Sequence, residues 1–220
     1  MQINFKLIRS NRSTLSLYVQ KNGEVLVKAP LFLPMQKIYQ FVDKKSEWIV
    51  KKQQLALMRY SLLPTLNSGE KIQILGEIYQ IELCEIKRAV VGEGKLILPS
   101  ENAKQHLKAY CLKEFKQYIT QRVQAYAMAG GILINGVRIS CATKRWGSCS
   151  AENKLSFNLS LCLLPKHLID YVILHELCHV FEKNHSERFY ALIVAKMPDY
   201  KKRVQELKGY SAFCDFFSKV

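Results

Sequence analysis

Residues 172–181 read VILHELCHVF, and this stretch decides what kind of domain the chain can form. Four residues advance a helix by about 400°, so His175 and His179 lie one turn apart on the same face and can reach one metal ion. Glu176 lies beside His175, close enough to touch a water on that ion without being a ligand. Three titratable groups in so apolar a helix carry a large desolvation cost unless they are paired or metal-bound. The stretch therefore predicts a metal site that activates water rather than a helix with ordinary core histidines.

A third histidine, His185, lies six residues beyond His179. On a straight helix it would be about 9 Å further along the axis. That is too far to share an ion whose bonds to nitrogen are about 2.1 Å long. We therefore expect the chain to turn back after Phe181. The polar residues 182–184 favour such a helix end, and Ser186 is placed to cap the next helix.

Strand-like and helical periods alternate along the rest of the chain, which predicts an α+β fold. A change of character near residue 100 suggests a β-rich α+β region over residues 1–100 and a second domain over residues 101–220. Asn22-Gly23 is typical of a tight hairpin turn, and Ser100 is placed to cap the long helix that follows. The expected elements are strands within 3–27, a helix over 35–60, strands within 72–98, a helix over about 100–129, strands over 137–143 and 154–162, and a helix that opens at Pro165.

The amino-acid composition is that of an ordinary globular protein. Of the 220 residues, 49% are apolar, 23% are charged and 10% are aromatic, which argues against disorder. Apolar runs stay well short of the roughly 20 residues that span a bilayer, and the polar–apolar alternation of residues 1–13 is unlike a signal peptide. Seven cysteines, an odd number without C-x-x-C spacing, argue against a disulfide framework and a cysteine zinc ribbon. We expect reduced thiols in a cytoplasmic protein with no membrane partner.

The chain is strongly basic, with 33 Lys and Arg against 18 Asp and Glu and a net charge of +15. Such an excess suits a nucleic-acid partner or another polyanion. The alternative explanation is a solvated basic surface. No recognisable nucleic-acid motif surrounds the basic residues, so the partner stays open.

An ordered set of motifs resembles the YgjP-like metallopeptidase family, which is related to the SprT-like zinc proteases. The resemblance implies a compact zincin-like metallopeptidase domain packed with the N-terminal β-hairpin and helix region. It implies one zinc ion per chain, with His175, His179 and His185 as ligands and Glu176 as general base. The motifs that carry it are Val27-Lys28-Ala29-Pro30, Trp48-Ile49, Arg145-Trp146-Gly147-Ser148-Cys149-Ser150, Asp170-Tyr171-Val172, His175-Glu176-Leu177-Cys178-His179, Asn184-His185-Ser186 and Phe189.

Two related ligand patterns fit less well. Metzincins share the histidine spacing but carry Gly where this chain has Glu182. They also need a Met-turn, which Met197-Pro198 resembles only weakly. A gluzincin site would take an acidic third ligand further downstream, such as Asp199. With His185 available, the three-histidine set is preferred.

The surroundings of the motif helix leave several roles open. Arg145 and Trp146 are candidates for the wall of the active site. Arg145, Tyr190 and Tyr200 are each able to stabilise an oxyanion. The strand over residues 154–162 could pair with an extended peptide substrate or could simply belong to the core.

These observations predict a zinc-dependent metallopeptidase that acts on a peptide or protein. One alternative is a metal-dependent hydrolase of nucleotide phosphoanhydrides, because a site that makes hydroxide does not by itself select the amide bond. A second alternative is a DNA-associated protease, by analogy with the SprT-like proteins. A purely structural zinc site fits less well, because three ligands leave an open position. The natural substrate and the oligomeric state do not follow from the sequence.

Overall fold

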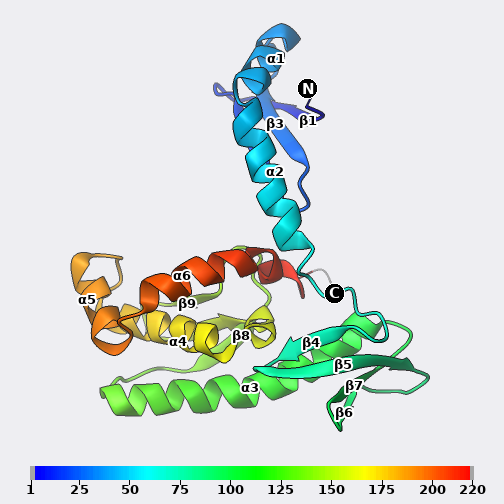
Figure 1. Ribbon diagram of the computed structural model, residues 1–220. Helices are drawn as coiled ribbons and strands as arrows, with labels where there is room; N and C mark the ends of the chain where they lie inside the picture. The colour runs from blue at the N-terminus through cyan, green and yellow to red at the C-terminus, as the bar shows by residue number, and fades with distance from the viewer. Residues whose placement is uncertain (1–2, 219–220) are drawn as a thin grey trace. The chain divides into compact units, whose positions relative to one another are not determined.

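A three-stranded sheet and two helices form the first of two compact units, residues 1–63, of the computed structural model, which describes residues 3–218 (Figure 1). The central strand β3 pairs with β2 antiparallel and with β1 parallel. The predicted turn joins β2 to β3, with Gly23 in the left-handed region at φ +83°. The elements are β1 (Lys6–Ser10), β2 (Ser16–Val19), β3 (Val25–Pro30), α1 (Met35–Lys44) and α2 (Ser46–Tyr60).

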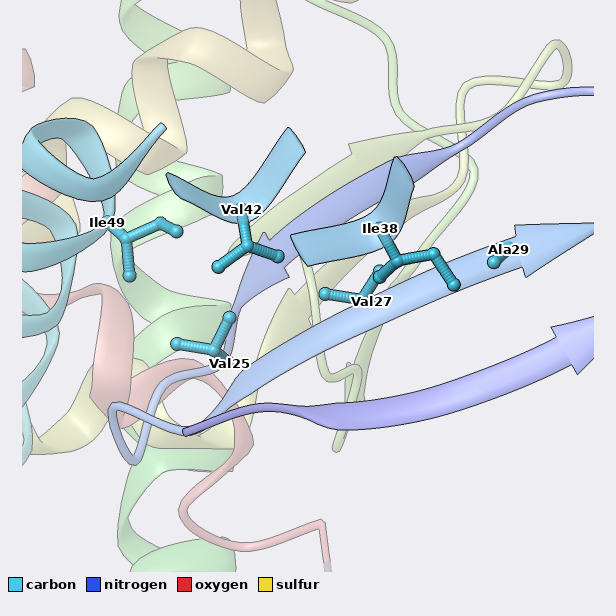
Figure 2. Close-up of a cluster of buried hydrophobic side chains, with 6 residues drawn as sticks. All are labelled: Val25, Val27, Ala29, Ile38, Val42 and Ile49. Atoms are coloured by element: carbon cyan, nitrogen blue, oxygen red, sulfur yellow. The ribbon is translucent and has the colours of Figure 1, made fainter. Parts of the chain in front are cut away.

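The core of this unit lies between β3 and the two helices. Figure 2 shows how its buried side chains face one another. The helix expected over residues 35–60 is broken at Lys45, whose backbone leaves the helical region. The helical spacing of the apolar residues continues across the break. The periodicity of the sequence therefore did not predict it. The six buried residues are Val25, Val27 and Ala29 of β3, Ile38 and Val42 of α1, and Ile49 of α2.

The second unit, residues 64–220, holds two small sheets and four α-helices in its described part. One sheet has the order β4-β5-β7-β6 and the other the order β8-β10-β9. The chain is thus a mixed α+β protein, as predicted. The elements of this unit are β4 (Lys71–Ile74), β5 (Glu77–Cys84), β6 (Val90–Gly92), β7 (Lys95–Pro99), α3 (Ala103–Gly130), β8 (Val137–Ser140), β9 (Gly147–Cys149), β10 (Leu155–Asn158), the 3₁₀ helix η1 (Leu159–Leu163), α4 (Lys166–Phe181), α5 (Glu187–Lys196), α6 (Tyr200–Gly209) and the 3₁₀ helix η2 (Tyr210–Asp215).

The division between the units lies earlier than the change of sequence character near residue 100. The sheet β4-β5-β7-β6 packs with the second unit, where β4 contacts η1 and β7 contacts α3. A hydrogen bond of 2.7 Å from the Leu75 amide to the Cys162 carbonyl joins the end of β4 to η1. These strands therefore share a core with the helices that follow them, which composition could not reveal.

Two expected elements differ in detail. Ser100 does not cap the long helix: α3 begins after Asn102, which adopts the left-handed conformation at φ 54°. The strand expected over residues 154–162 ends at Asn158 and continues as η1, and both are buried on all sides. β10 is also the central strand of its sheet, so it is not an edge at which a substrate could pair. The two edges are β8 and β9, and β9 lies between the two strands that the sequence predicted over residues 137–143 and 154–162.

The motif helix α4 is fixed in the centre of the second unit. It packs against α3, β9, α5 and α6. Arg122 of α3 makes a bidentate ion pair with Asp170 of α4, in which Nε donates to Oδ1 at 3.1 Å and Nη2 donates to Oδ2 at 2.8 Å. In the described part of the chain, no helix combines the length and the apolar character that crossing a membrane requires.

Candidate metal centre

Three histidines converge at the C-terminal end of α4. His175 and His179 lie one turn apart on this helix, with ring centroids separated by 4.9 Å. The helix ends at Phe181, and the Phe189 amide donates to the Ser186 hydroxyl at 3.3 Å, which caps α5. This turn brings back His185, as predicted, and its Nε2 lies 3.1 Å from Nε2 of His175.

The spacing of the three rings suits a metal ion. One ring nitrogen from each of His175, His179 and His185 lies within 4.8 Å of the other two. Two nitrogens bound to one tetrahedral zinc by bonds of about 2.1 Å would be about 3.4 Å apart. Among the described residues these three form the one group with this property, and Asp199 instead pairs with Arg203 at 2.9 Å. The downstream acidic ligand considered from the sequence is therefore not part of the cluster.

Neighbouring groups orient the rings. The Glu182 carbonyl can only accept a hydrogen bond, so its contact of 3.0 Å with His179 Nδ1 places the proton there and leaves Nε2 available for a metal. Tyr171 Oη lies 3.4 Å from His175 Nδ1 and helps to hold that ring in place, although a hydroxyl does not by itself select the tautomer. Phe189 is fully buried and stacks on the His179 ring at 4.5 Å. Phe189 thus packs an apolar ring against the histidine cluster.

Burial favours the neutral form of His175 and His179, which is the state that binds metal. Burial, together with the charges of His179 and His185, lowers the pKa of His175 to about 4. Burial also lowers the pKa of His179. At neutral pH each of these two imidazoles therefore carries one proton and keeps a lone pair on its other ring nitrogen for a metal.

Glu176 is a buried carboxylate next to the cluster. It is 5% exposed, and its Oε2 has no hydrogen-bond partner. Burial raises the pKa of Glu176 to about 8, although the charge of Arg145 acts in the opposite direction. A buried oxygen without a partner is costly, so a water held beside the histidines would satisfy it. The set of donors, three imidazoles and one unpartnered carboxylate oxygen, fits a metal ion with a water.

Gly147 lies directly against Glu176. A Cβ atom at residue 147 would be 2.6 Å from Oε1 and 2.7 Å from Cγ of Glu176. Only glycine therefore lets β9 approach the motif helix with the carboxylate in this position. The composition of residues 145–150 is unusual, but the sequence alone gave Gly147 no role. The contact joins residues 29 positions apart, and a local pattern carries no signal for it.

Asn158 is a second residue whose role the sequence did not reveal. It is 1% exposed, and its Nδ2 donates to the carbonyl oxygens of Ala142, Arg145 and Cys214 at 2.7, 3.1 and 2.8 Å. Its main-chain amide donates to the Trp146 carbonyl at 2.8 Å. Asn158 thus anchors the segment before β9 to β10 and to η2. In the sequence Asn158 is one of the polar residues of an alternating strand, and that alternation gave no sign of the anchor.

The residues that we expected to line the active site differ in how exposed they are. Arg145 is exposed but close enough to influence Glu176, and Trp146 is half-buried immediately before β9. The ring centroid of Tyr190 is 6.3 Å from that of His185, and Tyr190 stacks on Tyr200 at 5.8 Å. The geometry brings Tyr190 beside the histidines, while Tyr200 lies behind it.

One comparison with known proteins, a search against family models, gave a match. The family model described as YgjP-like, metallopeptidase domain, matches residues 13–210, which include the whole cluster and most of both units. No curated protein and no solved structure matched the chain.

Proposed function

The chain belongs to the YgjP-like metallopeptidase family, and on that premise we propose that it is a zinc-dependent peptidase of the zincin type. The observation that carries this proposal is the unpartnered, buried Oε2 of Glu176 beside three converging imidazoles. When bound by His175, His179 and His185, zinc would acidify a water and polarise the substrate carbonyl.

Glu176 has the position and the basicity for the proton transfers. Its carboxylate would accept a proton from the attacking water and later deliver it to the leaving amine. Because burial raises its pKa, this carboxyl is able to hold a proton between the two steps. The candidates for stabilising negative charge on the substrate oxygen are Arg145, whose charge acts on Glu176, and Tyr190, whose ring lies 6.3 Å from that of His185.

The edge strand β9 is the natural place for an extended peptide. It is paired on one side only, by β10, so its other side is able to accept a substrate strand by main-chain hydrogen bonds. Gly147, the first residue of β9, touches Glu176. A peptide paired along β9 would therefore run past the proposed base.

Two variants of the full chain test this proposal, with bound metal measured by mass spectrometry and cleavage by a fluorogenic peptide library. Glu176→Gln should keep one zinc per chain but lose about 10²–10⁴-fold in turnover, because only the base is removed. His185→Ala should lose zinc. The matched control is His167→Ala, since His167 lies on the same helix in an exposed pair with Glu206 and should leave both properties unchanged.

Wild-type turnover in Glu176→Gln with full metal content would refute the role of Glu176. Full zinc retention in His185→Ala would refute the ligand set. Hydrolysis of nucleoside triphosphates without any peptide cleavage would replace the proposed substrate class.

A further inference from the structure

The sheet of the first unit has one face that its own helices leave uncovered. Val25, Val27 and Ala29 of β3 point toward α1 and α2, as Figure 2 shows. The side chains that alternate with them point to the opposite face. We call this opposite face the outer face, and its residues are Lys6, Ile8 and Ser10 of β1, Ser16 and Tyr18 of β2, and Leu26, Lys28 and Pro30 of β3.

An aromatic ring and two lysines occupy the middle of the outer face. Lys6, Leu26 and Tyr18 form one row across the three strands, because Leu26 is in register with both of the others. Tyr18 is 50% exposed, and Lys28 Nζ lies 5.6 Å from its ring centroid. The Ser16 hydroxyl, and then the charges of Lys28 and Arg12, lower the pKa of the Tyr18 phenol. Lys28 and Arg12 thus bring positive charge to an exposed ring.

The first unit also carries most of the excess charge. Residues 1–63 contain eleven Lys and Arg but three Asp and Glu, a net charge of +8 out of the +15 of the chain. The three acidic residues are Glu24 at the hairpin turn, Asp43 on α1 and Glu47 on α2. The outer face itself is therefore positive.

We propose that the outer face binds a single strand of nucleic acid, with a base stacked on Tyr18 and phosphates bound by Lys6 and Lys28. A single strand offers both unstacked bases and phosphates, whereas a duplex hides its bases. Stacking and phosphate contacts do not read the sugar, so the proposal covers DNA and RNA strands alike. It goes beyond the proposed peptidase function and does not depend on the metal centre.

Fluorescence anisotropy with the full chain tests this proposal. The probes are a labelled 12-nucleotide oligo(dT) and an oligo(U) of the same length, titrated between 50 and 200 mM salt. Tyr18→Ala should weaken binding of both probes about tenfold, because it removes the stacking surface. Tyr18→Phe should bind like wild type. Lys28→Gln should reduce the magnitude of the slope of log K against log salt by about 0.7, the value for one phosphate on a single strand.

The same unit offers a matched control. On α2, Lys52 Nζ lies 5.9 Å from the ring centroid of Trp48, a second exposed pair of cation and ring. Trp48→Ala and Lys52→Gln should leave binding unchanged, and circular dichroism would confirm that every variant is folded. Loss of binding in these variants with wild-type affinity in Tyr18→Ala would overturn the proposal and place the site on α2.

Two other results would also overturn the proposal. One is the absence of binding by wild type at 50 mM salt. The other is displacement of the oligonucleotide by inorganic polyphosphate, or by vesicles of anionic lipid, equally from wild type and Tyr18→Ala. That result would show a general anion surface without base stacking.

Discussion

Substituting Gly147 by alanine tests whether the observed position of Glu176 is the working one. The added Cβ would lie 2.6 Å from Oε1, 2.7 Å from Cγ and 2.8 Å from Cδ of Glu176, whereas ordinary contacts begin at 3.4 Å. The carboxylate would therefore have to retreat by about 0.8 Å, and a displacement of about 1 Å costs about 10²-fold in rate. Since Cγ is also too close, rotation of the carboxylate alone does not relieve the overlap.

We expect Gly147→Ala to lower kcat about 100-fold, which corresponds to about 2.7 kcal/mol in the activation barrier. The closest atoms to the new methyl group all belong to Glu176, so zinc content should stay near one ion per chain. Steady-state kinetics on a peptide cleaved by the wild type, beside metal analysis and thermal unfolding, would measure these effects. The control is Gly209→Ala, because residue 209 has helical dihedrals and a Cβ added there would meet no atom within 4 Å.

A Gly147→Ala enzyme with wild-type kcat and full zinc content would contradict this reasoning. The carboxylate would then act from another position, or Glu176 would not be the base.

Two further predictions concern stability, measured by urea unfolding. Asn158→Ala removes the donor to three carbonyl groups, of which the Cys214 contact is buried and the other two are half-buried. Because an unsatisfied buried group costs about 1–3 kcal/mol, we expect a loss of about 3 kcal/mol. A loss below about 0.5 kcal/mol would show that water replaces the amide. Arg122→Ala breaks the bidentate pair with Asp170. Because the Arg122 side chain is 39% exposed, we expect the free energy of unfolding to fall by only about 1 kcal/mol, and by less when salt is added. A loss that does not change with salt would show that Arg122 stabilises the protein by packing rather than by charge.

Local geometry was enough to predict the histidine cluster. His175 and His179 share a face because of the helical period, and the polar residues after Phe181 together with Ser186 predicted the turn that returns His185. Each of these features depends on the backbone conformation of a few neighbouring residues. The hairpin turn at Asn22-Gly23 follows the same rule.

Tertiary packing decided which residues surround that cluster. Gly147 meets Glu176 across 29 residues, and Asn158 joins Arg145 to Cys214, which lies 56 residues beyond Asn158. The order of the sheet makes β9, rather than β10, the edge beside the proposed base. Such contacts depend on how segments far apart in the chain fill a common core, and the periodicity of one segment carries no information about its distant partner. Local patterns in the sequence thus predicted the histidine motif and its turn. The approach of Gly147 to Glu176 and the order β8-β10-β9 come instead from packing between distant segments, because no single segment specifies its partner.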